Sequence, residues 1–190
     1  SGIMRARATG QGCVVDAAIV DGTSHMMALL VSLGQQMSLT DRGVSLLDGP
    51  HWSRCYACAD GAHIAVQCLE PKFYASFLER MQLHRDPDFA HQFDKRLWPE
   101  LTARLTRLFA EQPRAHWQAV FDGTDACVAP VLNPAEAQSD PHIRARGIWL
   151  EGAPRPAPRF DGKTATPGPI PDRGADSAAI RADLLNEGWL

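Results

Sequence analysis

Apolar side chains recur at spacings of three and four residues from Val14 to Met37. This period is typical of an amphipathic helix and predicts one long helix over residues 14–37. At a rise of ~1.5 Å per residue, the helix would be about 36 Å long, which is more than a compact domain of this size usually needs. Gly22, near its middle, costs roughly 1 kcal/mol relative to alanine unless another backbone lies close to it. We therefore expect this helix to pack against something beyond its sequence neighbours.

Two apolar runs, over residues 55–59 and 63–69, flank the dipeptide Asp60-Gly61. This dipeptide suits the positive φ angles of a tight turn, so the pattern predicts a β-hairpin. Apolar residues alternate along the second run, which indicates that one face of the hairpin meets a core. That face carries Ile64, Val66 and Cys68.

Prolines mark the expected starts of four further helices, because the missing N–H of proline would have no partner at the first helical position. The first of these helices follows Pro71 and reaches about Leu83, and the others follow Pro99, Pro113 and Pro134. Apolar stripes support the first three helices: Phe73, Phe77, Leu78 and Met81, then Leu101, Leu105, Leu108 and Phe109, then Trp117 and Phe121. With a short buried strand over residues 126–132, the order of elements predicts a fold of the α/β (α+β) class.

The composition changes over residues 152–172, which hold six of the 14 prolines. This segment is expected to be extended and without a core. A last helix is predicted over about residues 175–187, ended by Gly188. The chain thus divides into three expected parts. They are a leading long helix and linker (1–50), a small α/β domain (51–150), and an extended Pro-rich tail with a C-terminal helix (151–190).

Composition then limits the classes of function. With 190 residues, of which 45% are hydrophobic, the chain can bury a substantial core, so disorder is excluded. The formal charge of −3 gives no field that would attract nucleic acid or an anionic membrane. The longest nearly apolar run, 26–33, is far shorter than the roughly 20 residues of a membrane span. We therefore predict no nucleic-acid partner and no membrane partner.

The five cysteines are an odd number, and no secretory leader pattern precedes them, which predicts free thiols and a cytoplasmic location. Cys55 and Cys58 have the spacing of a thiol redox pair, but they lie in a predicted strand instead of a strand-to-helix junction. His51 or His63 would add nitrogen ligands for zinc, yet no second paired set completes a site, so no metal is predicted. We interpret these cysteines as structural.

No cofactor is predicted either. Gly10 and Gly12 precede a helix, as in a dinucleotide-binding loop, but no strand comes before them and the third glycine is missing.

Glu70 is the candidate with the clearest physical basis. It ends a buried strand immediately before a Pro-started helix, where a carboxylate faces free backbone N–H groups and the positive end of the helix. Such a position holds a charge or a hydrogen-bond partner. A helix-start carboxylate without chemistry is the alternative from this pattern alone.

Five segments carry a resemblance to a known family. They are GCVVDAAIVDG (12–22), YACADG (56–61), LEPKFY (69–74), FDGTDACVAPVL (121–132) and the stretch from DPH to ARG (140–147). Together they resemble the α-methylacyl-CoA racemases of the family III CoA-transferase superfamily. The resemblance covers nearly all of this chain but only the C-terminal half of that family's chain.

The resemblance implies the small domain of a family III CoA-transferase-like fold. In that family a large CoA-binding domain and a smaller α/β domain form interlocked homodimers, and the chain end returns to the large domain. The long leading helix and the Pro-rich tail would then belong to a large domain whose main body is absent. A homo-oligomer is therefore expected.

The resemblance also implies a chemistry. Racemisation at C2 of a 2-methylacyl-CoA removes the α-proton, forms a thioester enolate and returns the proton to the opposite face, so two acid/base groups must flank the carbon. In the family these groups are a His and an Asp of the N-terminal half, and the Glu of the Leu-Glu-Pro segment partners the His. Here that residue is Glu70, which would orient the imidazole and stabilise its protonated form. Leu47, Trp52 and Leu69 are candidates for an apolar wall around the acyl chain, with ordinary packing as the alternative.

The sequence contains neither the family's CoA-binding segments nor the motifs that carry the His and the Asp. We therefore expect the chain alone to be inactive, and to bind an acyl-CoA thioester only when an N-terminal half completes the site. Two alternatives remain. One is a non-catalytic, self-associating or partner-binding module derived from this fold, and the other is part of a CoA-transferase with an aspartyl nucleophile.

Overall fold

The computed structural model describes residues 1–35, 42–150 and 152–187. The chain divides into two compact units, Ser1–Val131 and Leu132–Leu190, and each is described by itself. The three-part organisation expected from the sequence stays a prediction.

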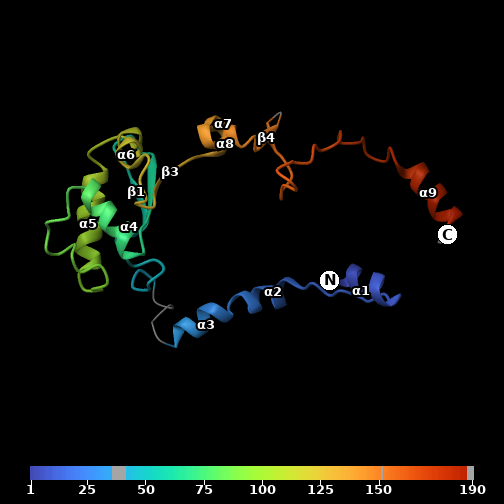
Figure 1. The fold of residues 1–190 in the computed structure, drawn as a ribbon, viewed down its shortest axis with the longest axis horizontal. Coiled ribbons are helices and arrows are strands. Elements are labelled where there is room, and N and C mark those ends of the chain that lie inside the picture. The colour runs from blue at the N-terminus through green and yellow to red at the C-terminus, as the bar shows by residue number, and fades with distance from the viewer. Residues whose placement is uncertain (36–41, 151, 188–190) are drawn as a thin grey trace. The chain divides into compact units, whose positions relative to one another are not determined.

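The centre of the first unit is an antiparallel sheet (Figure 1). Its strands are β1 (Ser53–Ala57), β2 (His63–Gln67) and β3 (Val128–Val131), and β2 lies between the other two. β1 and β2 form the predicted hairpin. At its turn, Gly61 has a φ of 76°, a left-handed conformation that glycine adopts without a steric penalty.

β3 differs from its prediction as a buried strand over residues 126–132. It is a shorter strand at the edge of the sheet, and its residues alternate between partly buried and exposed. Pro130 lies within it, opposite Ile64. Because proline has no N–H to donate to a second neighbour, it is confined to edge strands, and this residue explains the position of β3.

Three helices accompany the sheet: α4 (Pro71–Arg80), α5 (Trp98–Phe109) and α6 (Arg114–Phe121). α5 packs against β1, and α6 packs against β2 and β3. The predicted helix starts are confirmed to within one residue. α4 begins at Pro71 but ends at Arg80 instead of Leu83, α5 begins at Trp98, one residue before Pro99, and Pro113 is the residue before α6.

These elements enclose one hydrophobic core. The predicted inward face of the hairpin is confirmed, since all three of its members are buried. The core also takes in aromatic side chains of the helices and of the α4–α5 connection. Its largest fully buried members are Trp52, Phe77, Phe89, Phe109, Ile64, Leu101 and Leu105.

The predicted single helix over residues 14–37 is wrong in its extent. The structure has two shorter helices there, α2 (Ile19–Met26) and α3 (Ala28–Gly34), and a further helix, α1 (Gly2–Thr9), before them. The part of the prediction at residues 36 and 37 lies outside the described residues.

The helix begins late because its first residues favour extended backbone. Val14 and Val15 are β-branched, which lowers helix propensity. Their side chains are 95% and 68% exposed, so packing contributes little to offset that preference. Ala18, the residue before α2, is itself extended, with φ −64° and ψ 134°.

The second unit begins with α7 (Pro134–Ser139) and α8 (Pro141–Ala145), which are followed by a small antiparallel pair, β4 (Trp149–Leu150) and β5 (Ala153–Pro154). Asn133 and Glu136 form a complete capping box at the start of α7. The described Pro-rich residues have little regular structure and α9 (Ser177–Asn186) follows them, as predicted; the expected stop at Gly188 lies outside the described residues.

The mixture of an antiparallel sheet with helices confirms the α/β (α+β) class. Among the described residues, no helix is long and apolar enough to cross a membrane.

Candidate functional site

Segments that are distant in sequence lie close together at one end of the three-stranded sheet. β1 begins and β2 ends there, because the two strands are antiparallel and Ser53 pairs with Gln67. β3 begins beside them, where the Gln67 N–H donates to the Cys127 carbonyl at 3.0 Å. The loop before β1 is attached through the hydroxyl of Ser53, which donates to the carbonyl of Leu47 at 3.3 Å. Glu70, three residues beyond the end of β2, leads from this end of the sheet into α4.

Glu70 is the N-terminal cap residue of α4. Its backbone is extended, with φ −75° and ψ 142°, and its carbonyl accepts hydrogen bonds from the N–H groups of Phe73 and Tyr74 at 3.0 Å. Its side chain is exposed. Within the part of the chain that the structure describes, the Glu70 carboxylate has no hydrogen bond and no ion pair. The backbone at Glu70 is thus fixed, while its carboxylate remains open to a donor from outside.

The charges at this end of the sheet change the pKa of the Cys127 thiol. Partial burial raises the pKa of the Cys127 thiol, the negative charges of Glu70 and Asp125 raise that pKa further, and Lys72 lowers it. Glu70 and Cys127 therefore lie close enough for their charges to interact, although they are far apart in sequence.

The three apolar candidates have different surroundings. Leu47 and Leu69 are 55% and 40% exposed, so both offer apolar surface. Trp52 is only 1% exposed, and its indole N–H donates to the Gln92 carbonyl at 3.1 Å. Its ring meets those of Phe93 and Trp98 edge to face, at centroid distances of 5.6 and 6.5 Å. The structure thus gives Trp52 a packing role, and the contact of these residues with an acyl chain stays a prediction.

A series of buried hydrogen bonds joins His51 to α4. His51 is completely buried, and its Nε2 lies 2.7 Å from the hydroxyl of Tyr74, which donates to the carbonyl of Phe89 at 2.9 Å. The Tyr74 proton is thereby used, so the His51 Nε2 carries the hydrogen of the first bond. Burial lowers the pKa of His51 to about 4, with a smaller effect from Arg54. His51 is neutral at neutral pH and links the segment just before β1 to α4.

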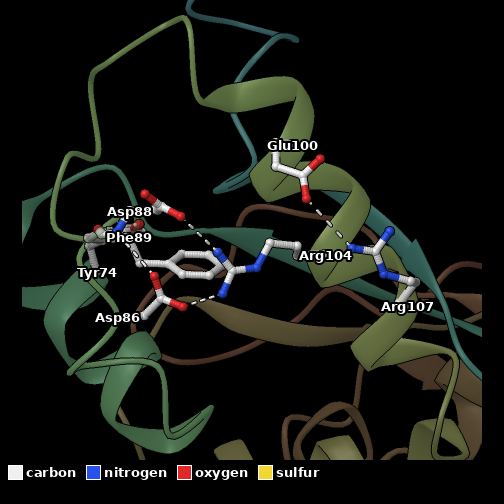
Figure 2. Close-up of polar contacts among 7 residues, drawn as sticks. All are labelled: Tyr74, Asp86, Asp88, Phe89, Glu100, Arg104 and Arg107. Carbon is white, nitrogen blue, oxygen red and sulfur yellow. Dashed lines mark hydrogen bonds and ion pairs between the residues drawn. The ribbon is translucent and has the colours of Figure 1, made fainter.

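The α4–α5 connection is attached to α5 by Arg104. Its guanidinium bonds the carboxylates of Asp86 and Asp88 and lies 4.9 Å from the centroid of the Phe89 ring (Figure 2). The hydrogen bond from Arg104 lowers the pKa of Asp86. This arrangement holds the connection in a defined conformation.

The cysteine thiols are free. Cys55 is exposed and Cys58 is buried, and both belong to the hairpin; their structural role stays a prediction. No group of three or more His, Cys, Asp or Glu side chains among the described residues is placed to hold a metal ion.

Sequence reasoning missed Gln92, Cys127 and Arg104. Gln92 is a lone polar residue in an irregular segment, and no pattern distinguishes it. The segment that contains Cys127 contributed to the family resemblance, but only the fold brings Cys127 near enough to Glu70 for their charges to interact.

Comparisons with known proteins identify the family of the chain. The family described as CoA-transferase family III matches residues 1–176. The human protein "Alpha-methylacyl-CoA racemase" is 37% identical over 168 residues, which cover 84% of this chain and 43% of the human one. The mouse protein of the same name is 36% identical over the same shares. The chain thus spans less than half the length of these relatives.

Solved structures show the same fold at lower identity. The crystal structure of Rv3272 from Mycobacterium tuberculosis has a TM-score of 0.67 and 18% identity, over 93% of this chain and 48% of that one. A CAIB/BAIF family protein from Brucella suis has a TM-score of 0.62 and 20% identity, over 96% of this chain and 50% of that one. Since the family match extends over most of the sequence, the chain belongs to CoA-transferase family III.

Proposed function

We propose that this chain is the C-terminal portion of a 2-methylacyl-CoA racemase, in which Glu70 orients an imidazole supplied by an N-terminal half. The observation that carries the proposal is the exposed Glu70 carboxylate, which has no partner among the described residues, on a backbone fixed by the start of α4. The identity of 36–37% to two proteins named as α-methylacyl-CoA racemases supports the choice of reaction.

In this mechanism Glu70 is a positioning residue. Its carboxylate accepts a hydrogen bond from one N–H of the imidazole, so the opposite nitrogen faces the α-proton of the thioester. The imidazole takes that proton, the electron pair moves into the thioester enolate, and an aspartic acid on the other face returns a proton to C2. During this step the negative charge of Glu70 stabilises the imidazolium that forms.

The remaining parts of the proposal follow from the same reaction. Leu47 and Leu69 contribute apolar surface near the acyl chain, and the substrate is an acyl-CoA thioester that binds only to the completed site. We propose no further cofactor. The active form is a homo-oligomer in the cytoplasm.

Complementation tests the proposal. The chain is mixed with the N-terminal half of a matching racemase, and exchange of the α-hydrogen of a 2-methylacyl-CoA is followed in D₂O. We expect exchange from the mixture and none from either half alone. Glu70→Gln should lower the rate at least about tenfold, because the neutral amide stabilises the imidazolium less.

Glu79→Gln is the matched control, since it removes the same charge from an exposed position in the last turn of α4. This variant should exchange at the rate of the unaltered chain. A mixture of folded, associated halves that gives no exchange would count against the racemase reaction. An unchanged rate in Glu70→Gln would remove the role of Glu70.

A non-catalytic, self-associating module is a second candidate, favoured by the apolar surface of the leading segment. Its exposed side chains are Val14, Val15, Ile19, Val20, Met26, Leu29 and Val31. Burial of such surface between copies would drive association. Sedimentation at high concentration tests this candidate, and a strictly monomeric chain would oppose it.

A CoA-transferase reaction is the third candidate. The "Acetyl-CoA:oxalate CoA-transferase" of Acetobacter aceti is 25% identical over 93% of this chain. Transfer of CoA between two acids by the completed protein, without α-hydrogen exchange, would favour it over the racemase.

A further inference from the structure

A single buried amide contacts the backbone just before Glu70. Gln92 lies in the α4–α5 connection, and its side chain is almost completely buried. Its Nε2 donates to the carbonyl of Cys68 at 3.0 Å and to the carbonyl of Leu69 at 2.9 Å. Both hydrogens of the amide are therefore used, and both acceptors belong to the two residues that precede Glu70.

These two carbonyls follow the last residue pair of the β1–β2 ladder. The last residue pair between β1 and β2 is Ser53 with Gln67, and one further backbone hydrogen bond joins the Cys68 N–H to the Trp52 carbonyl at 3.1 Å. At Cys68 and Leu69 the amide of Gln92 supplies hydrogen-bond donors from a different part of the chain. The direction in which the backbone leaves the sheet toward Glu70 thus depends on this side chain.

The backbone of Gln92 is itself fixed. Its carbonyl accepts hydrogen bonds from the indole N–H groups of Trp52 at 3.1 Å and Trp98 at 2.9 Å. Both rings are buried in the core, one just before β1 and the other at the start of α5. Two rigid aromatic side chains therefore fix the backbone of Gln92. The side-chain amide of Gln92 in turn bonds the two residues before Glu70.

The rest of the α4–α5 connection is attached at a second point. Figure 2 shows the Arg104 guanidinium between Asp86 and Asp88, beside the ring of Phe89. The Tyr74 hydroxyl bonds the Phe89 carbonyl, which links the same connection to α4. Gln92 thus extends from a segment that is attached to both neighbouring helices, so it is a fixed point for the backbone it contacts.

We propose that Gln92 is a positioning residue for Glu70, which sets the placement of the carboxylate by holding the two carbonyls before it. The inference rests on the function proposed above and adds a specific residue to it. Without these hydrogen bonds the connection from β2 to α4 is held at its two ends only, by the Cys68 N–H bond to the Trp52 carbonyl and by the first turn of α4, and the carboxylate loses its alignment with the imidazole. A displacement of about 1 Å in such a group costs up to about 100-fold in rate.

Gln92→Met tests the proposal, because methionine has a similar length and no hydrogen-bond donor, and the backbone carbonyl of residue 92 is kept. In the complementation assay we expect kcat for α-hydrogen exchange to fall at least about tenfold, with KM for the acyl-CoA little changed, because alignment acts on the transition state. Gln112→Met, at an exposed position between α5 and α6, is the control and should leave both constants unchanged.

A double-mutant cycle separates positioning from a general loss of structure. If Gln92 acts through Glu70, adding Gln92→Met to Glu70→Gln should lower kcat for α-hydrogen exchange little further. If Gln92→Met instead lowers kcat by the same factor with and without Glu70→Gln, the positioning role is overturned, while the racemase function remains intact. No exchange by the unaltered mixture would overturn the proposed function, and the positioning role with it.

Gln92→Asn provides a second variant in case Gln92→Met does not fold. It keeps the amide but is one methylene shorter, so it cannot reach both carbonyls in their present positions. The same cycle applies to it. A kcat equal to that of the unaltered chain in a folded Gln92→Asn protein would contradict the proposal.

Discussion

The buried imidazole of His51 gives the most specific stability prediction. The ring is completely buried and donates from Nε2 to the Tyr74 hydroxyl, and its Nδ1 has no hydrogen-bond partner among the described residues. Burial lowers its pKa from 6.5 to about 4. His51→Gln removes the titrating group and keeps a side chain that donates to Tyr74.

The sign follows from proton linkage. The pKa is lower in the folded state, so the unfolded chain binds a proton between pH 6.5 and about 4 that the folded chain does not bind. The stability due to neutral His51 is therefore fully present above pH 6.5 and is lost as the pH falls. The free energy of unfolding then falls by up to about 1.4 kcal/mol per pH unit, and the total loss at pH 4 is about 3 kcal/mol.

Urea unfolding, followed by tryptophan fluorescence from pH 7.5 to 4.5, measures this loss. Between pH 7.5 and 4.5, the free energy of unfolding of the unaltered chain should fall by about 2–3 kcal/mol more than that of His51→Gln. This comparison does not depend on how the two stabilities differ at neutral pH. His84→Gln, at an exposed position, controls for the loss of an imidazole. The depressed pKa of Asp94, about 2 because of its hydrogen bonds to Arg96, affects all three proteins alike. Identical pH dependence of stability in the unaltered chain and in His51→Gln would show that His51 does not titrate with a lowered pKa in the folded state.

Two further substitutions test the core and the hairpin by the same unfolding assay. Leu105→Ala removes a fully buried side chain of α5 and should cost about 2–5 kcal/mol, whereas Leu29→Ala, at an exposed position of α3, should change stability by less than about 0.5 kcal/mol. Equal effects would contradict the assignment of the core. Gly61→Ala forces a Cβ into the left-handed conformation of the hairpin turn and should cost about 1 kcal/mol. A neutral result would show that this turn adopts another conformation.

The elements that the sequence predicted well depend on local signals. Asp60-Gly61 specifies a turn through the conformational freedom of one glycine, and the alternation through Ile64 and Val66 fixes which face of the hairpin is buried. Pro71 begins α4 because its backbone already suits the first helical turn. Each signal acts over a few residues, so the rest of the fold is not needed to interpret it.

The features that the sequence did not reveal depend on distant contacts. The period from Val14 onward is helical, but residues 14–18 lie outside α2 because exposed, β-branched side chains gain little from packing. Gln92 is indistinguishable in sequence from a loop glutamine, and its role appears only where the α4–α5 connection meets the end of β2. Glu70 was predicted from local pattern and family resemblance, whereas its proximity to Cys127 required the sheet.

The proposed function requires that the Glu70 carboxylate face an imidazole from outside this chain. The most direct test is the pKa of the catalytic histidine of the N-terminal half, measured by NMR in complex with the unaltered chain and with Glu70→Gln. The histidine pKa should fall by about one unit in the variant complex, because a neighbouring carboxylate stabilises the charged imidazole. A histidine pKa that is the same in the two complexes would show that Glu70 does not lie against this imidazole.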